Sequence, residues 1–551
     1  MTELIAEIPA WFPKASEFLT FSPELAWVGT LCLIMLAPLA IGRDARVTAG
    51  LAIVGIAVTA FFTFKVMGIV STEGPQTGLT PNLAGGMLIA DNLSLFFKLL
   101  LLAFLVGVSI LWMSVSAKQE DDAPEFFVLL VGSALGMSLM VSTQNILMMI
   151  IAIEFASLPS YAIVGFNKEK RIAAEASLKY MIFGSVSAAV MLYGVSLIYG
   201  FFGTLDIAQI AANAGPVLEA GGANRLLVGL GMFCVFVGIA FKISAVPFHF
   251  WCPDAFEGAK TEVTAWLSVA SKAAGLLLLM RLAHVFCQNA GAEVLRGFAI
   301  VIAVVATITC TVGNLSAYKQ TSVKRMLAYS SIAHAGYMMA AAAILVDAGQ
   351  VESFTAISAV LAYVVVYMLM NLGAFGVVAL LESKNGGDDS ITAFAGLGWK
   401  TPILAIPMLF CLVSLVGIPP FAGFITKWYL LAALGETGIG LYWALAIVIV
   451  INTLISLWYY MRVVVQMFLK DTDEPGHEVP MSGALLVNVC GALLIVLLVF
   501  SNPLKNKSDQ YSVGLFSASS AALTDLGKDD SLAQSNSQAN EGDIMEGNHG
   551  G

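Results

Sequence analysis

Residues 238–259 read GIAFKISAVPFHFWCPDAFEGA, a stretch that begins as an apolar membrane segment and is then interrupted. Lys242 lies inside the apolar run, Pro247 follows five positions later, and His249 and Trp251 come soon after. Proline removes a backbone donor and disturbs the preceding helical turn, and a lysine is costly in lipid. A charge beside a helix break therefore needs an explanation beyond spanning the membrane.

The composition places this stretch in a membrane protein. Of the 551 residues, 58% are hydrophobic and only 12% are charged, and the mean hydropathy is +0.86. A soluble protein is roughly half apolar and about a quarter charged. The chain is therefore predicted to be an all-α polytopic membrane protein. Its net charge of −10 comes mostly from loops and the C-terminal tail, so it does not indicate nucleic-acid binding.

Several kinds of site are not indicated by the sequence. The seven cysteines are scattered, mostly in apolar runs and without C-x-x-C spacing, which is typical of small buried hydrophobic residues rather than disulfides, zinc or iron–sulfur sites. The chain contains neither G-x-G-x-x-G nor a Walker A sequence, so we expect no dinucleotide binding or ATP hydrolysis. The N-terminus lacks a basic region and is not an ordinary cleaved signal peptide.

About 20 apolar residues cross a bilayer core. This length divides the chain into fourteen predicted spans, at residues 24–42, 47–70, 92–116, 123–142, 144–166, 175–203, 224–250, 261–287, 295–316, 323–347, 353–382, 401–434, 439–469 and 481–500. The break at Pro247 interrupts the seventh span, and Pro419 with Pro420 interrupts the twelfth.

The basic residues predict the orientation. The loops after odd-numbered spans contain Arg43, Arg46, Lys118, Lys168, Lys170, Arg171, Lys260, Lys319, Lys324, Arg325, Lys384, Lys400 and Lys470. The loops after even-numbered spans contain only Arg225 and Arg296. By the positive-inside rule the odd-span loops are cytoplasmic, and both termini lie on the non-cytoplasmic side. The polar residues 504–551 are predicted to form a disordered tail.

Titratable side chains inside the spans are the candidate functional groups. They are Glu154, Lys179, Lys242, Lys272, His334 and Lys427. For Glu154, Lys242, Lys272 and Lys427, apolar turns on both sides exclude the alternative that the side chain reaches the membrane surface.

The other titratable groups have stronger structural alternatives. Lys179 lies near the start of its span, and His334 is equally compatible with a neutral core histidine. Lys65, Lys98, Arg281 and Arg462 lie nearer span ends, where long basic side chains commonly extend to the surface or anchor the helix.

Partly buried lysines with a counter-charge can hold or release a proton as the partner moves, and a line of them forms a proton relay. Irregular backbone at membrane depth is tolerated where protein or water satisfies it, and paired broken segments in two halves of a transporter indicate an ion site. Prolines are also common in membrane helices, which is the structural alternative. The sequence nevertheless places a lysine beside a proline break twice, and we expect a water-filled cavity beside Lys242.

Four motifs resemble one family, the antiporter-like proton-channel subunits of respiratory complex I, and among them subunit N most specifically. They are IEFASLPSYAIVGF with AAEASLKYMIFG (153–184), FKISAVPFHFWCPDAFEGAKTEVTAWLSVASKAAGLLLLMRL (241–282), NLSAYKQTSVKRMLAYSSIAHAGYMM (314–339) and GIPPFAGFITKWYLL (417–431). The resemblance implies two inverted five-helix repeats, at 122–290 and 291–470, with broken helices 7 and 12. Helices 1–3 (1–121) precede these repeats and a last helix (471–503) follows them.

The resemblance also implies the residue roles. Glu154 pairs with Lys242 on the broken seventh helix, Lys272 lies at the middle of a central hydrophilic axis, and Lys427 leads towards the exit side. His334 lies between Lys272 and Lys427, and Lys179 matches a sixth-helix lysine. The segment EGAKTEVTAW departs from the family, which usually has a proline after EGA, and the role of Lys260 and Glu262 there is open.

The implied function is proton translocation by a membrane-arm subunit of NADH-quinone oxidoreductase. NADH, FMN, iron–sulfur clusters and quinone are then bound by other subunits, this chain binds no cofactor or metal, and its partners are other complex I subunits in a bacterial inner membrane. Three alternatives stay open: a subunit of a multisubunit cation/proton antiporter, a subunit of a membrane-bound hydrogenase or formate-linked complex, and a non-conducting scaffold. A small-solute carrier is disfavoured because no polar cluster shapes a solute pocket.

Overall fold

The computed structural model describes residues 15–74, 76–77, 86–116, 122–290, 292–347, 350–471 and 478–512. The first part of the chain forms seven helices: α1 (Ala15–Thr20), α2 (Ser22–Ile41), α3 (Ala45–Glu73), α4 (Asn92–Val115), α5 (Ala123–Val141), α6 (Ile146–Val164) and α7 (Arg171–Phe202). Two short antiparallel strands, β1 (Gln76–Thr77) and β2 (Ile89–Ala90), pair before α4.

The middle of the chain contains the interrupted seventh segment. The elements in this middle part of the chain are α8 (Ile207–Ala220), α9 (Gly222–Ile243), α10 (Trp251–Gly258), α11 (Thr261–Trp266), a π-helical turn (Leu267–Ser271), α12 (Lys272–Ala290), α13 (Ala292–Ala317), α14 (Val323–Asp347) and α15 (Gln350–Glu382). A 3₁₀ turn (Ile391–Phe394) follows, and then α16 (Leu397–Lys400), α17 (Pro402–Val416), α18 (Ala422–Glu436), α19 (Gly440–Leu469) and α20 (Met481–Val499).

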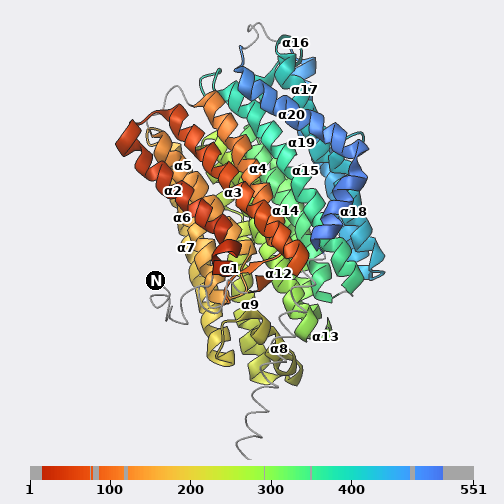
Figure 1. Ribbon diagram of the computed structural model, residues 1–551. Helices are drawn as coiled ribbons and strands as arrows, with labels where there is room; N and C mark the ends of the chain where they lie inside the picture. The colour runs from red at the N-terminus through yellow and green to blue at the C-terminus, as the bar shows by residue number, and fades with distance from the viewer. Residues whose placement is uncertain are drawn as a thin grey trace, which may run out of the picture.

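The predicted all-α polytopic class is confirmed. Among the described residues, thirteen helices are long and apolar enough to cross a membrane, and a fourteenth span results when the bent segment Ile391–Lys400 with Pro402–Val416 is counted as one. The predicted span 401–434 covers α17 and most of α18, each 15 residues long and separated by residues 417–421. The long helices run side by side, with α8 at one end of the molecule and α16 at the other (Figure 1).

The helices differ in how deeply they lie in the bundle. The span Thr261–Phe286 is fully buried, and Val323–Val346 and Glu352–Glu382 are 94% buried. In contrast, α2, α7, α19 and α20 bury only about a third of their length, so they form the outer layer. The three central spans carry Lys272 and His334, which are therefore remote from any lipid around the subunit.

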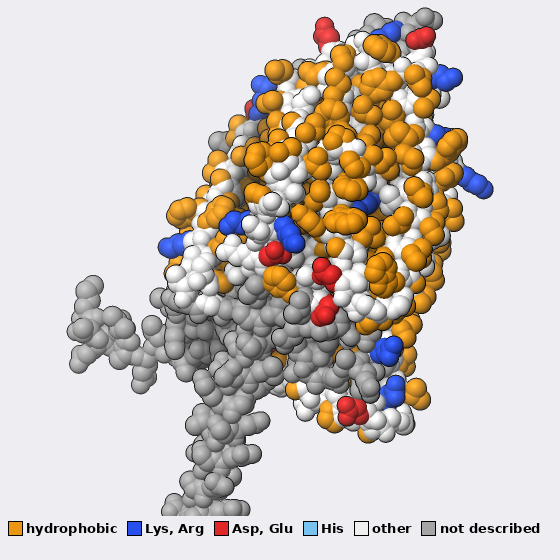
Figure 2. All heavy atoms as spheres, turned by 90° about the vertical axis from the view of Figure 1, so that its right-hand side faces the viewer, with side chains coloured by type: hydrophobic (Ala, Val, Ile, Leu, Met, Phe, Trp, Pro, Cys, Tyr) orange, Lys and Arg blue, Asp and Glu red, His pale blue; other side chains and the backbone are white. Residues whose placement is uncertain are grey.

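The outer surface suits a bilayer. Figure 2 shows a broad band of hydrophobic side chains on one face, with charged side chains sparse in its middle. Four tryptophans on the outside of the bundle are exposed: Trp399 on α16, Trp428 on α18, and Trp443 and Trp458 on α19. Tryptophan is enriched where lipid meets water.

The prediction of a disordered tail is wrong for residues 504–512, because residues 501–512 are helical. Ser358 Oγ donates to Asp509 Oδ1 at 2.5 Å, and the ring of Tyr511 lies 4.9 Å from that of Phe96. A ring contact with Phe96 on α4 and a hydrogen bond from Ser358 on α15 hold this polar sequence, which local composition does not reveal. Residues 513–551 lie outside the described residues, and the predicted inverted repeats and domain boundaries stay predictions.

Candidate functional site

The first part of the site joins α6 to the end of α9. Lys242 lies in the last turn of α9 and is fully buried, and its Nζ donates to Ser157 Oγ at 3.1 Å. Glu154 is three residues before Ser157 on α6, so the two side chains share a helix face. Glu154 also interacts electrostatically with Lys242. Among the described residues Glu154 and Lys242 form no direct ion pair, so their pairing stays a prediction, and Ser157 is the hydrogen-bond partner of the lysine.

The interruption after Lys242 is stabilised from within the protein. The α9 helix ends at Ile243, Ser244 adopts a left-handed backbone conformation (φ 65°), and Pro247 lies between α9 and α10. Trp251 Nε1 donates to the Phe241 carbonyl at 3.1 Å, and Ser271 Oγ donates to the Lys242 carbonyl at 3.3 Å. The Phe241 carbonyl also accepts from the Ser244 backbone at 3.0 Å, and the Ser271 bond provides a partner for the Lys242 carbonyl near the end of the helix.

Lys272 lies in the centre of the bundle, immediately after the π-helical turn. Its Nζ is 3.5 Å from Cys252 Sγ, 4.8 Å from the ring centroid of Phe256 and 5.7 Å from that of Trp251. Among the described residues, no carboxylate forms an ion pair with Lys272. The aromatic faces stabilise its cation, and the thiol is its hydrogen-bond partner.

His334 lies on α14 within a group of buried hydroxyls. Its Nδ1 is 2.7 Å from Tyr363 Oη and its Nε2 is 3.5 Å from Tyr460 Oη, and Tyr460 also hydrogen-bonds Ser330. Cys252 Sγ lies 4.0 Å from Ser331 Oγ, one helical turn before His334. The sequence indicated the histidine and the lysine but not the thiol and hydroxyls between them, because Cys, Ser and Tyr are ordinary core residues.

Lys427 is held at the second interruption. Its Nζ donates to the Leu415 and Val416 carbonyls at 3.0 and 2.8 Å and lies 5.0 Å from the centroid of the Tyr337 ring. Those carbonyls belong to the last two residues of α17, and the C-terminal end of a helix carries partial negative charge. Pro419 and Pro420 lie between α17 and α18. The proline break therefore supplies the oxygen atoms that hold the lysine.

Lys179 does not join this central group. Its side chain is 42% exposed and forms ion pairs with Glu175 at 2.8 Å and Asp254 at 2.9 Å. Arg325 is 3.0 Å from Asp254 and also pairs with Glu257. Asp254 and Glu257 are both on α10, the short helix that carries Cys252. The short helix α10 thus carries both Cys252, the hydrogen-bond partner of Lys272, and the two carboxylates of this surface charge network.

A polar cavity of about 400 Å³ lies beside this network. Lys260 and Glu262, the charged residues in the segment that departs from the family, both line it. Glu262 is 2% exposed and accepts a bond from Ser116 Oγ at 2.8 Å. Lys260 lies 5.1 Å from the centroid of the Phe166 ring, and burial lowers the pKa of Lys260 while the charge of Glu262 opposes this shift. The pair therefore lies in the wall of a hollow at the predicted cytoplasmic end.

Two buried ion pairs were not predicted. Lys98 pairs with Glu24, and each side chain is 3% exposed. Arg281 Nη2 is 2.8 Å from Asp91 Oδ2, with 4% and 0% exposure. The alternative that Lys98 and Arg281 extend to the membrane surface is wrong, because each meets a carboxylate from another helix or its cap. The one sequence feature that could have indicated the first pair is Glu24, an acidic residue in an otherwise apolar segment.

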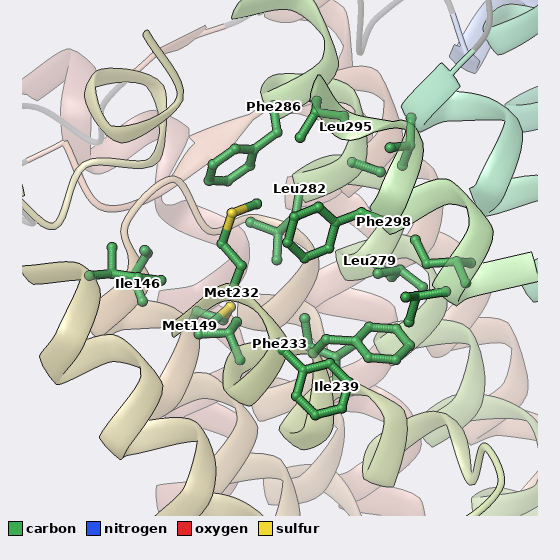
Figure 3. A pocket seen from close by; sticks show the side chains of 17 residues that line it. Ile146, Met149, Met232, Phe233, Ile239, Leu279, Leu282, Phe286, Leu295 and Phe298 are labelled. Carbon is green, nitrogen blue, oxygen red and sulfur yellow. The ribbon is translucent and has the colours of Figure 1, made fainter. Parts of the chain in front are cut away.

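A different kind of hollow, of about 100 Å³, is lined by apolar side chains. Met149, Phe233 and Phe298 are among them (Figure 3). None of its lining residues is titratable. Among the described residues, no group of three or more His, Cys, Asp or Glu side chains could hold a metal ion.

The buried lysines at two interrupted helices define an antiporter-like polytopic membrane subunit. A family model described as NADH:quinone oxidoreductase/Mrp antiporter, transmembrane, matches residues 143–456. NADH-quinone oxidoreductase subunit N of Anaeromyxobacter sp. (strain Fw109-5) is 38% identical over 509 residues, covering 88% of this chain and 93% of that protein. The chain belongs to the NADH-quinone oxidoreductase subunit N family.

Solved structures agree with this assignment. A chain of respiratory complex I from Thermus thermophilus with bound aureothin matches with a TM-score of 0.70 and 28% identity, covering 88% of this chain and 98% of that one. A chain of the Mrp complex from Dietzia sp. DQ12-45-1b matches with a TM-score of 0.78 at 19% identity, over 93% of this chain and all of that one. The second likeness concerns the fold alone.

Proposed function

We propose that this chain is a proton-translocating membrane-arm subunit of NADH-quinone oxidoreductase. The observation that carries the proposal is the set of buried cations Lys242, Lys272 and Lys427, each beside polar or aromatic groups inside a subunit N fold. Buried lysines that are retained at this cost commonly act in proton transfer.

The side chains suggest how a proton moves. Glu154 stabilises the charge on Lys242, so a change in their separation alters the proton affinity of the lysine. From Lys272 the thiol of Cys252 and the hydroxyl of Ser331 lead towards His334. Gaps in this series exceed direct hydrogen-bond length, and proton transfer across them requires water or side-chain rotation. Lys427 receives the proton at the second interruption.

Electron transfer takes place elsewhere in the complex in this proposal. NADH, FMN, the iron–sulfur clusters and quinone are bound by other subunits, and their reaction changes the charges beside this chain. The protein lies in the bacterial inner membrane with α16 on the cytoplasmic side and both termini on the opposite side. Lys179 belongs to the cytoplasmic charge network in this arrangement, rather than to the central series.

The alternatives have less support. The relatives with substantial identity are subunit N proteins, whereas the Mrp likeness is limited to the fold. No contact within the described part of the chain favours a hydrogenase-type complex. A pure scaffold would gain stability if buried cations were replaced by apolar residues, and this provides a direct test.

The test compares Lys242→Ala with Lys65→Ala in membrane vesicles, because Lys65 is also in a predicted span but is exposed. NADH oxidation with quinone and acidification of the lumen are recorded together, and assembly is checked on a native gel. We expect Lys242→Ala to lose coupled pumping in an assembled complex, while Lys65→Ala retains it. Unchanged pumping in Lys242→Ala would refute the relay, and selective loss of sodium–proton exchange would identify an antiporter.

A further inference from the structure

A hollow of about 510 Å³ lies beside the C-terminal part of α19, and none of its lining residues belongs to the proposed relay. It is lined by Thr321, Ser390, Ile391, Thr392, Trp458, Met461, Arg462, Val465 and Gln466. The volume is within the usual range for a small-molecule site. Its lining is divided: one part is a guanidinium, an amide and three hydroxyls, and the other part is apolar.

The charge in this hollow has no acidic partner. Arg462 Nη1 donates to the Tyr318 carbonyl at 2.6 Å, and among the described residues no carboxylate forms an ion pair with Arg462. The two nearby acids are engaged elsewhere: Asp389 accepts from Ser322 Oγ at 2.5 Å, and Asp388 accepts from the Ser390 backbone at 2.9 Å. A guanidinium retains further donors after one such bond, and these suit phosphate oxygens.

The hydroxyl side of the hollow is rigid. Ser390 Oγ and Thr392 Oγ1 lie 2.9 Å apart, and the Ile391 backbone donates to the Thr321 carbonyl at 2.8 Å. Val323 donates in turn to the Asp389 carbonyl at 2.8 Å. The two loops that present the hydroxyls are therefore fastened together, and a ligand would meet donors that are already in place.

The apolar side continues onto the outer surface of α19. Trp458, Arg462 and Gln466 are four residues apart and share one helix face. Trp458 is 60% exposed and Leu454, one turn earlier, is 66% exposed. Apolar groups thus point towards the middle of the span, and polar groups follow near its end. A phospholipid has the same order of apolar chain and polar head group.

We propose that this hollow binds the head group of an anionic phospholipid, with the phosphate at Arg462 and the three hydroxyls and an acyl chain along Trp458 and Val465. The loops that form it are predicted to be cytoplasmic and contain Lys319, Lys384, Lys400 and Lys470. Such a basic membrane face attracts anionic lipids of the cytoplasmic leaflet. The site is separate from the proton relay and does not depend on it.

The test uses the whole purified complex and a photoactivatable phosphatidylglycerol, with the labelled peptide identified by mass spectrometry. We expect label within residues 454–466. Arg462→Gln should lower this labelling roughly tenfold, as for loss of one charge-assisted contact. Arg462→Lys should keep part of it. Lys168→Gln is the matched control, because it removes one positive charge at the same predicted membrane face from an exposed residue that neither lines the hollow nor lies in the loops that form it.

Three further measurements distinguish a lipid phosphate from free phosphate and provide a second variant in case Arg462→Gln does not fold. Photoactivatable phosphatidylcholine should label this peptide weakly, and millimolar inorganic phosphate should not compete. Thr392→Val removes only an exposed hydroxyl and should also reduce labelling. Equal labelling of Arg462→Gln and wild type overturns the proposal. So does competition by inorganic phosphate, which indicates a free-anion site, or labelling only after neighbouring subunits are removed, which indicates a subunit interface.

Discussion

Neutral partners hold the three central lysines. Lys242 donates to a serine hydroxyl, Lys272 to a thiol, and Lys427 to two backbone carbonyls. Among the described residues, a carboxylate acts electrostatically on Lys242, that of Glu154, and on neither of the other two lysines. Such partners stabilise a cation without the deep energy minimum of a direct ion pair, so the charge can leave when its surroundings change.

The pair of Lys98 and Glu24 shows the opposite arrangement, because each charge is buried against the other. We expect Glu24→Gln alone to destabilise the protein by about 3–5 kcal/mol, since it leaves a buried lysine without its counter-charge. Unfolding of the purified complex by denaturing detergent measures this change.

The control for that pair is the double replacement Glu24→Leu with Lys98→Met, which removes both charges and should be close to neutral. Pumping should persist in the double variant, because neither residue contacts the central lysines in the described structure. Loss of pumping at unchanged stability would instead assign the pair to proton transfer.

At the scale of the element, the interruption between α17 and α18 positions Lys427. Gly417 has φ +82°, and a Cβ there would lie 2.7 Å from Lys427 Cδ. We expect Gly417→Ala to displace the lysine and to lower the number of protons pumped per NADH oxidised severalfold. Simultaneous records of lumen acidification and NADH oxidation provide this ratio.

Gly438→Ala is the matched control, because Gly438 has φ +66° but no atom within 4 Å of the added Cβ. Both variants bear a similar backbone cost, of about 1–2 kcal/mol for a left-handed residue with a side chain. Equal pumping defects in the two variants would show that backbone strain, rather than contact with Lys427, is responsible.

The helical residues 501–512 fasten three other helices. Asp509 accepts from Ser358 on α15, Tyr511 packs on Phe96 of α4, and Lys505 Nζ lies 5.5 Å from the Tyr429 ring of α18. Ending the chain after Phe500 should lower the free energy of unfolding by about 2–4 kcal/mol, from the lost ring pair and charged hydrogen bond. Ending it after Ser512 should not, and equal melting temperatures for the two truncations would contradict this role.

At the scale of the whole molecule, the bundle separates a central set of titratable side chains from an apolar exterior. The outer helices α2, α7, α19 and α20 surround the spans that carry Lys272 and His334. The low polarity around each central charge makes its proton affinity sensitive to a neighbouring charge. In the outer layer, lipid head groups and water would screen such a charge, and its proton affinity would respond less to a neighbouring charge.

The orientation of the whole subunit can be tested with single cysteines. Asn506→Cys and Trp399→Cys replace exposed residues, the first within the helical residues 501–512 and the second on α16. In a Cys32→Ser background, a membrane-impermeant thiol reagent should label Asn506→Cys in right-side-out vesicles and Trp399→Cys only in inside-out vesicles. The reverse pattern would overturn the orientation that the basic residues predict.

Much of the architecture could be predicted from sequence because each span is a local property. Runs of about 20 apolar residues must satisfy their backbone as helices in lipid, so composition alone places the spans. Charges such as Lys242 and Lys272 could be identified for the same reason, since their cost in an apolar run is visible without a fold. The helix ends near Pro247 and Pro420 likewise follow from proline chemistry.

The partners of those charges were decided only by tertiary structure. Cys252 meets Lys272, Glu24 meets Lys98, and Asp509 meets Ser358 across 20, 74 and 151 positions of sequence. Nothing local distinguishes a serine or cysteine that faces a buried lysine from one that faces leucine. The sequence by itself determined which residues are costly in a membrane, and helix packing decided what stabilises each of them, because that depends on which faces meet.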